Sequence, residues 1–431
     1  MHPNAFRLEA SSAALQSLLA FSQPADQALR RFFREHANLG QNDRAFVAER
    51  CFSVLRHLRL LRELSGRSAP RSLLLAALTV LDGLSLRQLE PLISAQERAW
   101  LEQLRAAPRA QLPPAVRLSL PDWLWDRLCE TMPPAQAEAL ARGMLEPAPL
   151  DLRVNTLRAA REAVLAQLHK DGIAAQPTAL SPVGIRLGGK PALQTHPLFL
   201  NGTVEVQDEA SQLLAFLVAP RRREMVVDFC AGAGGKTLAL GALMRSEGRV
   251  YAFDTSERRL ASLKPRLKRS GLSNVTPQHI DSENDSRIKR LAGKIDRVLV
   301  DAPCSGLGTL RRNPDLKWRH NPKDIAELVA KQTVILESAA RLVKPGGRLV
   351  YATCSVLPEE NEDMIAAFLA RHPQFEARDC SAILAQHKIA LATGVFFRVL
   401  PHSHGMDGFF AAVLERIERT PLPAAPAENA S

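Results

Sequence analysis

The stretch "MVVDFCAGAGGKTLAL", residues 225–240, decides the fold, because a short apolar strand, a glycine-rich turn and a helical pattern follow one another directly. Gly232, Gly234 and Gly235 permit positive φ angles and let a ligand approach the backbone closely. The N-terminus of the helix that follows offers unpaired N–H groups to a polar or anionic ligand. This order of elements predicts an α/β domain that binds a small ligand at the turn.

From residue 225 onward, short apolar strands alternate with helical patterns along the chain. Strands are predicted at 225–230, 249–254, 275–281, 296–303 and 347–354. Near-continuous apolar strands separated by helices indicate a parallel sheet that is covered on both faces. The stretch 396–416 predicts two more strands, joined by a polar loop as an antiparallel pair at the sheet edge. We therefore expect a mostly parallel, seven-stranded sheet within residues 221–418.

The beginning of the chain has a helical pattern instead. Apolar residues recur at helical spacing within 43–64, and the segments 71–84 and 136–145 continue in the same way. No lysine occurs before residue 151, so this region is basic through arginine alone. Arginine suits bidentate contacts to phosphate, although a genome that favours arginine codons explains the bias equally well. We predict an all-α region over residues 1–116.

Between the helical region and the glycine turn, the pattern is mixed. A strand pattern begins at 151, and a helix that ends at Gly172 and further short strands follow it. These features predict a helical linker and a small α+β unit over residues 117–220. The last residues, 419–431, are rich in proline and alanine and predict a disordered tail.

Composition limits the function further. The 431 residues carry a formal net charge of +11, which attracts polyanions such as nucleic acid, although a basic surface can also serve solubility alone. The six cysteines are scattered without a CxxC pair, which indicates reduced thiols and a cytoplasmic setting. The N-terminus does not resemble a signal peptide, and no apolar run reaches the length of a membrane helix. We expect no membrane association.

The glycine turn discriminates between three ligands. A P-loop requires glycine where Cys230 stands, and a dinucleotide fingerprint requires a third glycine where Thr237 stands. S-adenosylmethionine remains, because its carboxylate and amino group fit such a turn. The predicted cofactor contacts in the turn are Cys230, Ala231, Gly232, Ala233, Gly234, Gly235 and Lys236.

Three aspartates support a ligand site at the same edge of the sheet. Asp254, Asp281 and Asp301 end the second, third and fourth predicted strands. The carboxyl ends of parallel strands face the crevice in which ligands bind. Each aspartate alone is more simply a helix N-cap, but three in register favour cofactor contacts. Asp254 is placed to bind the ribose hydroxyls, and Asp281 lies where an adenine amino group is expected.

Two cysteines follow buried strands without the spacing of a disulfide pair. The stretches "DAPCSGLGTLRRNPDLKW" (301–318) and "YATCSVLPEENE" (351–362) contain Cys304 and Cys354. Together they resemble the Sun/NOP family of RNA cytosine-5 methyltransferases. The resemblance covers residues 150–417 and implies a Rossmann-like class I methyltransferase domain. The helical region before it is similar to the NusB-like RNA-binding domain of the RsmB-like bacterial branch, which acts on 16S ribosomal RNA.

The resemblance also implies roles for individual residues. Carbon 5 of cytosine is a poor nucleophile, and a thiolate that adds to carbon 6 raises its electron density. The resemblance assigns this attack to Cys354 and the release of the product to Cys304. Sequence alone leaves the order of the two thiols open, because DNA cytosine methyltransferases attack with the Pro-Cys cysteine. Asp301 would contact the base or the methionine end, and Lys236 would lie near the cofactor or the base.

Basic and aromatic residues after Cys304 are candidates for RNA contacts. Arg311 and Arg312 are placed for the RNA backbone, and Trp318 is available either for stacking on a base or for packing. His402 and His404 lack a third ligand at suitable spacing, so we predict no metal.

We therefore predict an S-adenosylmethionine-dependent RNA cytosine-5 methyltransferase that acts on ribosomal RNA, with 16S as the expected substrate, and that is monomeric. One alternative is the same chemistry on tRNA or 23S RNA. The other is an RNA-binding assembly factor that keeps the fold without catalysis.

Overall fold

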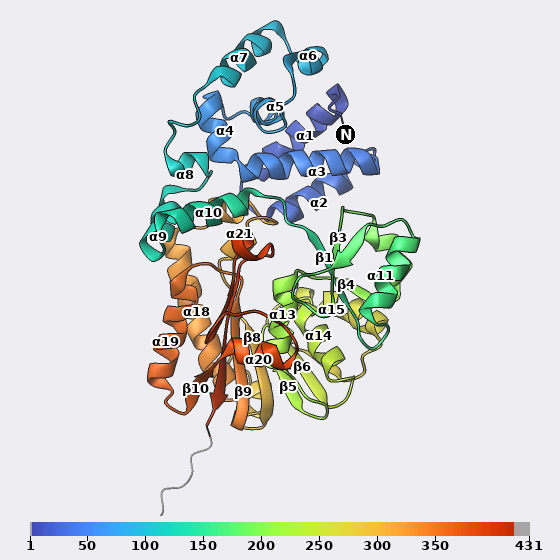
Figure 1. Cartoon of the computed structure of the whole chain (residues 1–431), viewed down its shortest axis with the longest axis vertical. Helices are drawn as coiled ribbons and strands as arrows, with labels where there is room; N and C mark the ends of the chain where they lie inside the picture. The colour runs from blue at the N-terminus through green and yellow to red at the C-terminus, as the bar shows by residue number, and fades with distance from the viewer. Residues whose placement is uncertain (1, 418–431) are drawn as a thin grey trace, which may run out of the picture.

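The computed structural model describes residues 2–417, and the predicted tail at 419–431 lies outside the described residues. Helices form the upper part of the molecule, a large sheet forms the lower part, and a small sheet lies beside it (Figure 1). No helix within the described range is long and apolar enough to cross a membrane.

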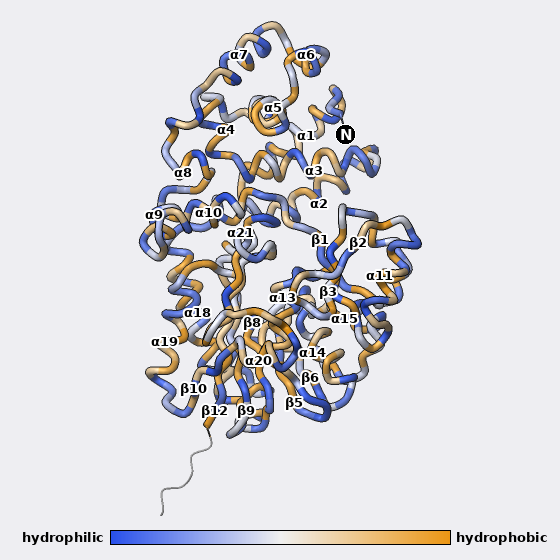
Figure 2. Tube along the Cα trace, in the orientation of Figure 1, coloured by the Kyte–Doolittle hydropathy of each residue, from blue (hydrophilic) through white to orange (hydrophobic). Residues whose placement is uncertain are grey.

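The first part of the chain is helical, as predicted. Its elements are α1 (Ala5–Leu18), α2 (Ala25–Glu35), α3 (Gln41–Arg56), α4 (Leu58–Ser65), α5 (Pro70–Val80), α6 (Leu86–Leu89), η1 (Glu90–Leu92), α7 (Ala95–Ala106), α8 (Pro114–Arg117), α9 (Asp122–Thr131) and α10 (Pro134–Leu145). The predicted helix at 43–64 divides at His57, so α3 and α4 are separate helices. Helix α5 is hydrophobic almost throughout (Figure 2), and its buried residues form the centre of this region.

A small four-stranded antiparallel sheet follows, in the order β2-β3-β1-β4. Its elements are β1 (Leu150–Val154), α11 (Arg161–Lys170), β2 (Ala175–Pro177), β3 (Gly184–Leu187), η2 (Leu193–Thr195), α12 (Pro197–Leu200) and β4 (Val204–Val206). Helix α11 packs on one face of the sheet through Val164 and Leu168. The division of the chain at residues 116, 220 and 418 stays a prediction.

The large sheet contains eight strands, and seven of them form the continuous order β10-β12-β9-β8-β5-β6-β7. They are β5 (Met225–Asp228), β6 (Arg249–Asp254), β7 (Val275–His279), β8 (Ile295–Asp301), β9 (Val343–Thr353), β10 (Phe375–Arg378) and β12 (Phe409–Arg416), and β11 (Phe396–Val399) pairs with β12 alone. The five strands from β5 to β9 are parallel, as predicted.

The carboxyl-terminal strands correct one expectation. The predicted antiparallel pair is β11 and β12, but β12 does not lie at the edge. It also pairs with β9 and with β10, a strand that the sequence pattern did not reveal. Apolar and polar residues alternate over only the four residues of β10, which is too short a pattern to distinguish a strand from a loop.

Helices cover both faces of the large sheet. One face packs against α13 (Glu209–Val218), α14 (Gly235–Leu243), α15 (Glu257–Ser270) and α20 (Cys380–Gln386). The other packs against α16 (Ser286–Lys289), α18 (Pro322–Ala340) and α19 (Glu362–Arg371). Four short elements complete the chain: η3 (Leu307–Thr309), α17 (Leu316–Arg319), η4 (Pro358–Glu360) and α21 (Pro401–His404).

The segment after Cys304 joins the helical region to the large sheet. Trp318 Nε1 donates to the carbonyl oxygen of Leu55 at 2.9 Å, and the buried Lys317 Nζ donates to that of Arg56 at 2.8 Å. Asp315 accepts from the backbone N–H of Ala25 at 3.1 Å, where a carboxylate is favoured by the N-terminus of α2. Of the two roles considered for Trp318, the structure therefore shows packing.

Candidate active site

A cavity of about 480 Å³ opens at the carboxyl ends of the parallel strands. Strand β5 lies between β6 and β8, so the cavity lies where the strand order reverses, which is where open α/β sheets bind ligands. Most of the predicted site residues line it: Cys230, Ala231, Gly232, Ala233, Gly235, Lys236, Asp254, Asp301, Cys304 and Cys354. The structure thus brings both thiols and the glycine turn into one site.

The glycine turn is held by the acid that ends β6. Asp254 Oδ2 accepts from the backbone N–H of Gly232 at 2.8 Å, and Oδ1 accepts from that of Ser256 at 2.7 Å. Gly232 has a φ of +56°, and open space surrounds the position where a Cβ would project. Each oxygen of Asp254 retains a second lone pair for a ligand hydroxyl.

Gly234 has a structural role instead. Its φ is +80°, and an added Cβ would lie 2.1 Å from Leu263 Cδ1. It is the N-cap of α14 and packs against α15, and it does not belong to the lining of the cavity. Glycine is therefore required here for the close approach of two helices.

Lys236 and Asp301 form an ion pair across the cavity. Lys236 Nζ lies 2.7 Å from Asp301 Oδ2 and 5.4 Å from the centre of the Phe409 ring. Burial alone would lower the pKa of Lys236, but the Asp301 carboxylate outweighs burial and raises it. The lysine is therefore positively charged at neutral pH, beside a carboxylate that can accept a hydrogen bond from a ligand.

Asp228 is a lining residue that the sequence analysis missed. Its Oδ2 accepts from Thr237 Oγ1 at 2.6 Å, whereas its buried Oδ1 has no hydrogen-bond partner among residues 2–417. Burial raises the pKa of Asp228 to about 7. An orphaned acceptor at a cavity wall fits a ligand that brings a donor. The rule that identified the other aspartates, an acid at a strand end, also applies to Asp228.

Asp281 does not join the other predicted residues. Its side chain is 79% exposed and pairs with Arg287 at 3.3 Å, and it does not belong to the lining of the cavity. Strand β7 ends at His279, so the chain has already turned away at Asp281. Glu283 lines the cavity instead. A cofactor contact by Asp281 stays a prediction that this placement does not favour.

The two thiols lie side by side. Cys304 Sγ is 3.4 Å from Cys354 Sγ and accepts from the backbone N–H of Cys354 at 3.3 Å. The hydrogen bond with Cys354 and burial raise the pKa of Cys304 well above its ordinary value. Cys304 is therefore a protonated thiol at neutral pH, which makes it a weak nucleophile and a possible proton donor.

Arg311 and Arg312 make hydrogen bonds within the protein. The Arg311 side chain is buried and donates to the backbone oxygens of Met406 and Pro147. Arg312 donates to Asp208 at 2.9 Å and to Asp407 at 2.5 Å. Both guanidinium groups thus make hydrogen bonds inside the protein, and a contact with the RNA backbone stays a prediction that this placement does not favour.

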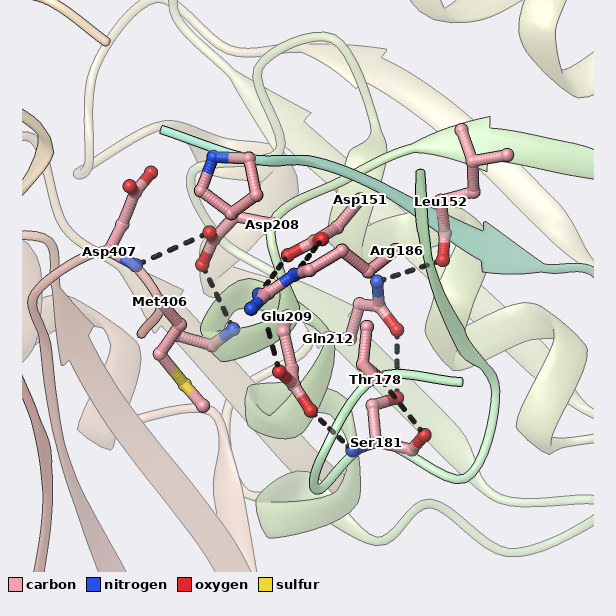
Figure 3. A network of polar contacts seen from close by, with 12 residues as sticks. Asp151, Leu152, Thr178, Ser181, Arg186, Asp208, Glu209, Gln212, Met406 and Asp407 are labelled. Atoms are coloured by element: carbon pink, nitrogen blue, oxygen red, sulfur yellow. Dashed lines mark hydrogen bonds and ion pairs between the residues drawn. The ribbon is translucent and has the colours of Figure 1, made fainter. Parts of the chain in front are cut away.

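Figure 3 shows a buried polar network around α13. Arg312 joins this network through its ion pairs with Asp208 and Asp407. In that network, Arg186 donates to both oxygens of Asp151, at 2.8 and 2.9 Å, and lies 3.6 Å from Glu209. Asp208 also accepts from the backbone N–H of Asp407 at 3.3 Å. The network therefore fixes the small sheet against the loop that leads to Phe409 in the cavity.

Further lining residues, to which the sequence analysis assigned no role, include Gln207, Ser211, Arg259, Arg266, Lys331 and Phe409. No group of three His, Cys, Asp or Glu side chains within residues 2–417 is arranged to hold a metal ion.

The sheet order and the cavity define a Rossmann-like methyltransferase domain. A family profile described as 16S rRNA methyltransferase RsmB/F matches residues 215–415, and one for a RsmF/B-like, ferredoxin-like domain matches residues 120–194. The chain is 36% identical to ribosomal RNA small subunit methyltransferase B of Sodalis glossinidius, over 87% of this chain and 90% of that protein. It is 37% identical to the protein of the same name from Shewanella oneidensis, over 72% and 70%. The chain therefore belongs to the RsmB/F family of 16S rRNA methyltransferases, which confirms the Sun/NOP resemblance.

A solved structure extends the likeness to the N-terminal helices. The crystal structure of PH0851 matches with a TM-score of 0.79 and 28% sequence identity, over 96% of this chain and 100% of that one. The all-α character of the N-terminal region is confirmed, whereas its NusB-like nature stays a prediction.

Proposed function

We propose that this protein transfers a methyl group from S-adenosylmethionine to carbon 5 of a cytosine in small-subunit ribosomal RNA, through a covalent bond between Cys354 and the base. The observation that carries the proposal is the pair of thiols, 3.4 Å apart, in the same cavity as the glycine turn. The names of the relatives support ribosomal RNA as the substrate.

The residues present fit the cofactor. The backbone of Gly232 is open to the cavity, Asp254 retains free lone pairs for ribose hydroxyls, and the orphaned Oδ1 of Asp228 suits an ammonium donor. When bound, S-adenosylmethionine supplies the methyl group as an electrophile. Gly234 packs against Leu263 of α15, and we assign it no contact with the cofactor.

The chain's own residues activate the base. Cys354 adds to carbon 6 as a thiolate, and the electron pair of the C5–C6 double bond becomes available at carbon 5. Asp301 and Lys236 hold the base from the side of β8, because their ion pair offers both an acceptor and a donor to it. After methylation, the proton on carbon 5 passes to a water molecule, the electron pair of the C5–H bond re-forms the C5–C6 double bond, and the C6–S bond breaks with Cys354 leaving as a thiolate. Cys304, whose sulfur lies 3.4 Å from that of Cys354, assists this release as a thiol that donates a hydrogen bond to the leaving sulfur.

The first experiment expresses the wild type, Cys304→Ala, Cys354→Ala and the control Cys129→Ala in bacteria lacking their own copy of the enzyme. We expect RNA to remain covalently attached to Cys304→Ala, which shifts its band on a denaturing gel. Cys354→Ala should show no adduct and no 5-methylcytosine by mass spectrometry of RNA nucleosides. Cys129 lies on α9, away from the cavity, so its substitution should leave methylation unchanged.

Other outcomes would change the proposal. An adduct in Cys354→Ala would exchange the roles of the two thiols. No adduct in either variant, with folded proteins that bind S-adenosylmethionine, would favour an RNA-binding factor without catalysis. Sequencing of the trapped RNA identifies the target and separates 16S RNA from tRNA and 23S RNA. A monomeric state and a cytoplasmic location stay predictions.

A further inference from the structure

Glu360 is a fully buried acidic residue between the two cysteine turns, and the mechanism proposed above does not use it. It ends η4, six residues after Cys354, and its relative exposure is 0%. A carboxylate is costly to bury unless hydrogen bonds replace its lost hydration. The hydrogen-bond donors to Glu360 therefore indicate which part of the site the buried acid stabilises.

Both turns donate to this one carboxylate. Glu360 Oε1 accepts from the backbone N–H of Ser305 at 2.8 Å, and Oε2 accepts from Ser305 Oγ at 2.5 Å. Oε2 also accepts from the hydroxyl of Ser355. Ser305 directly follows Cys304, and Ser355 directly follows Cys354. The carboxylate thus connects the residues next to both thiols.

Gln332 of α18 completes the arrangement. Its Nε2 donates to Glu360 Oε1 at 2.9 Å and to the carbonyl oxygen of Pro303 at 3.0 Å. Cys304 is therefore held on both sides, through Pro303 and through Ser305. The hydroxyl of Tyr351, on β9, donates to the backbone oxygen of Glu360 at 2.7 Å and fixes the acid itself. Four donors on two oxygens match an ionised carboxylate, which only accepts hydrogen bonds.

Glu360 does not belong to the lining of the cavity, and neither do Ser305 and Ser355. The acid therefore cannot touch a base or a cofactor there, and it can act only through the cysteines. Its contacts determine where the two turns lie relative to each other, because it is a shared acceptor for both.

We infer that Glu360 is a positioning residue that holds the thiols of Cys304 and Cys354 in the relative placement that attack and release require. The expected effect of Glu360 on methyl transfer rests on the proposed function, whereas its effect on the placement of the thiols does not. Two measurements separate these consequences.

The first measurement is methyl-transfer kinetics of Glu360→Ala and Glu360→Gln. Alanine leaves four donors without their acceptor, and we expect kcat to fall about 100-fold, as for a small misplacement of reacting groups. The KM for RNA should stay within about twofold, because Glu360 does not reach the substrate. Glutamine keeps an acceptor for the Ser305 N–H, and its amide can donate to the two serine hydroxyls, so it should restore most of kcat. The matched control is Glu359→Gln, one residue earlier, whose carboxylate pairs with Arg127 outside the network.

The second measurement needs neither RNA nor cofactor. Dibromobimane bridges thiols that lie close together, and mass spectrometry identifies the bridged peptides. We expect a Cys304–Cys354 bridge in the wild type, in Glu359→Gln and in Glu360→Gln. In Glu360→Ala the bridge should form at least about tenfold more slowly, because the turns no longer share an acceptor.

The outcomes distinguish the positioning of the thiols by Glu360 from the proposed methyl transfer. Unchanged kcat and unchanged bridging in Glu360→Ala would overturn the inference, as would absence of the bridge in the wild type. Slower bridging in Glu360→Ala, with no methylation by any form of the protein, would support positioning and remove the proposed function. If Glu360→Ala does not fold, Ser355→Ala decides: it removes one donor, and unchanged kcat and bridging would then overturn the inference.

Discussion

The turn after β8 and the turn after β9 carry the same Cys-Ser pair at the same edge of the sheet, yet their continuations differ. The chain after Cys354 returns directly to the large sheet through η4 and α19. The chain after Cys304 runs outward to the N-terminal helices, where Trp318 and Lys317 donate to carbonyl oxygens at the end of α3. Both turns pack against α9 and α10, and the chain after Cys304 additionally reaches the end of α3.

The surroundings of Cys304 determine the acidity of its thiol. The hydrogen bond between the two sulfurs and burial raise the pKa of Cys304, and the hydrogen bond that its sulfur accepts from the Cys354 backbone N–H opposes them in part. The Cys-Ser motif alone does not reveal this shift. The same principle separates two carboxylates or two histidines in other acid–base sites.

The largest effect is expected where the two turns touch. Gly308 N donates to the carbonyl oxygen of Cys354 at 2.8 Å, and an alanine Cβ at 308 would lie 2.2 Å from the oxygen of Gly408. Because the obstructing atoms belong to the backbone, Gly308→Ala should lower the free energy of unfolding by about 3 kcal/mol. Urea unfolding tests this expectation. Gly189→Ala, with no atom within 4 Å of the added Cβ, is the control. Equal stability of the two variants would show that the turns can separate.

A smaller effect concerns the thiols themselves. Cys354→Ala removes the first cause of the raised pKa of Cys304, so the thiolate fraction of Cys304 at pH 8 increases. Alkylation of Cys304 by iodoacetamide should therefore accelerate, because the thiolate is the reactive form. Mass spectrometry of the peptides measures the rate, with Cys129 of the same chain as the internal reference. An unchanged rate would mean that burial alone raises the pKa of Cys304.

The smallest effect tests the outward continuation of the Cys304 turn. Trp318→Phe removes the hydrogen bond to Leu55 but keeps most of the ring packing, so the free energy of unfolding should fall by about 1 kcal/mol. The control is Trp125→Phe on α9, whose indole makes no hydrogen bond within residues 2–417. If both variants lose the same stability, the hydrogen bond contributes nothing and the Cys304 turn is less dependent on the helices than its contacts suggest.

Local sequence was sufficient for the features that depend on neighbouring residues. The parallel strands, the glycine turn and the acids at strand ends follow from apolar runs and from the geometry of parallel sheets. Asp254 and Asp301 lie where that rule places them, and Asp228 could have been found by the same rule. Asp281 departs from it because β7 ends two residues earlier.

Features that depend on distant partners could not be predicted. Arg311 and Arg312 have the sequence of an exposed basic pair, but their partners lie near residues 147, 208 and 407. Glu360 stands in an acidic run that resembles a solvated helix start, and only the fold brings Ser305 to it. A charge pattern along the chain does not reveal which charges will be desolvated together.

The contacts at the end of α3 have a consequence for the order of synthesis. The carbonyl oxygens of Leu55 and Arg56 have no partner within their own helix, and their donors stand 263 and 261 residues further along the chain. A protein emerges from the ribosome N-terminus first, so these oxygens remain hydrated until most of the polypeptide has been made. The end of α3, which is synthesised early, therefore completes its hydrogen bonding only after the Cys304 turn has been translated.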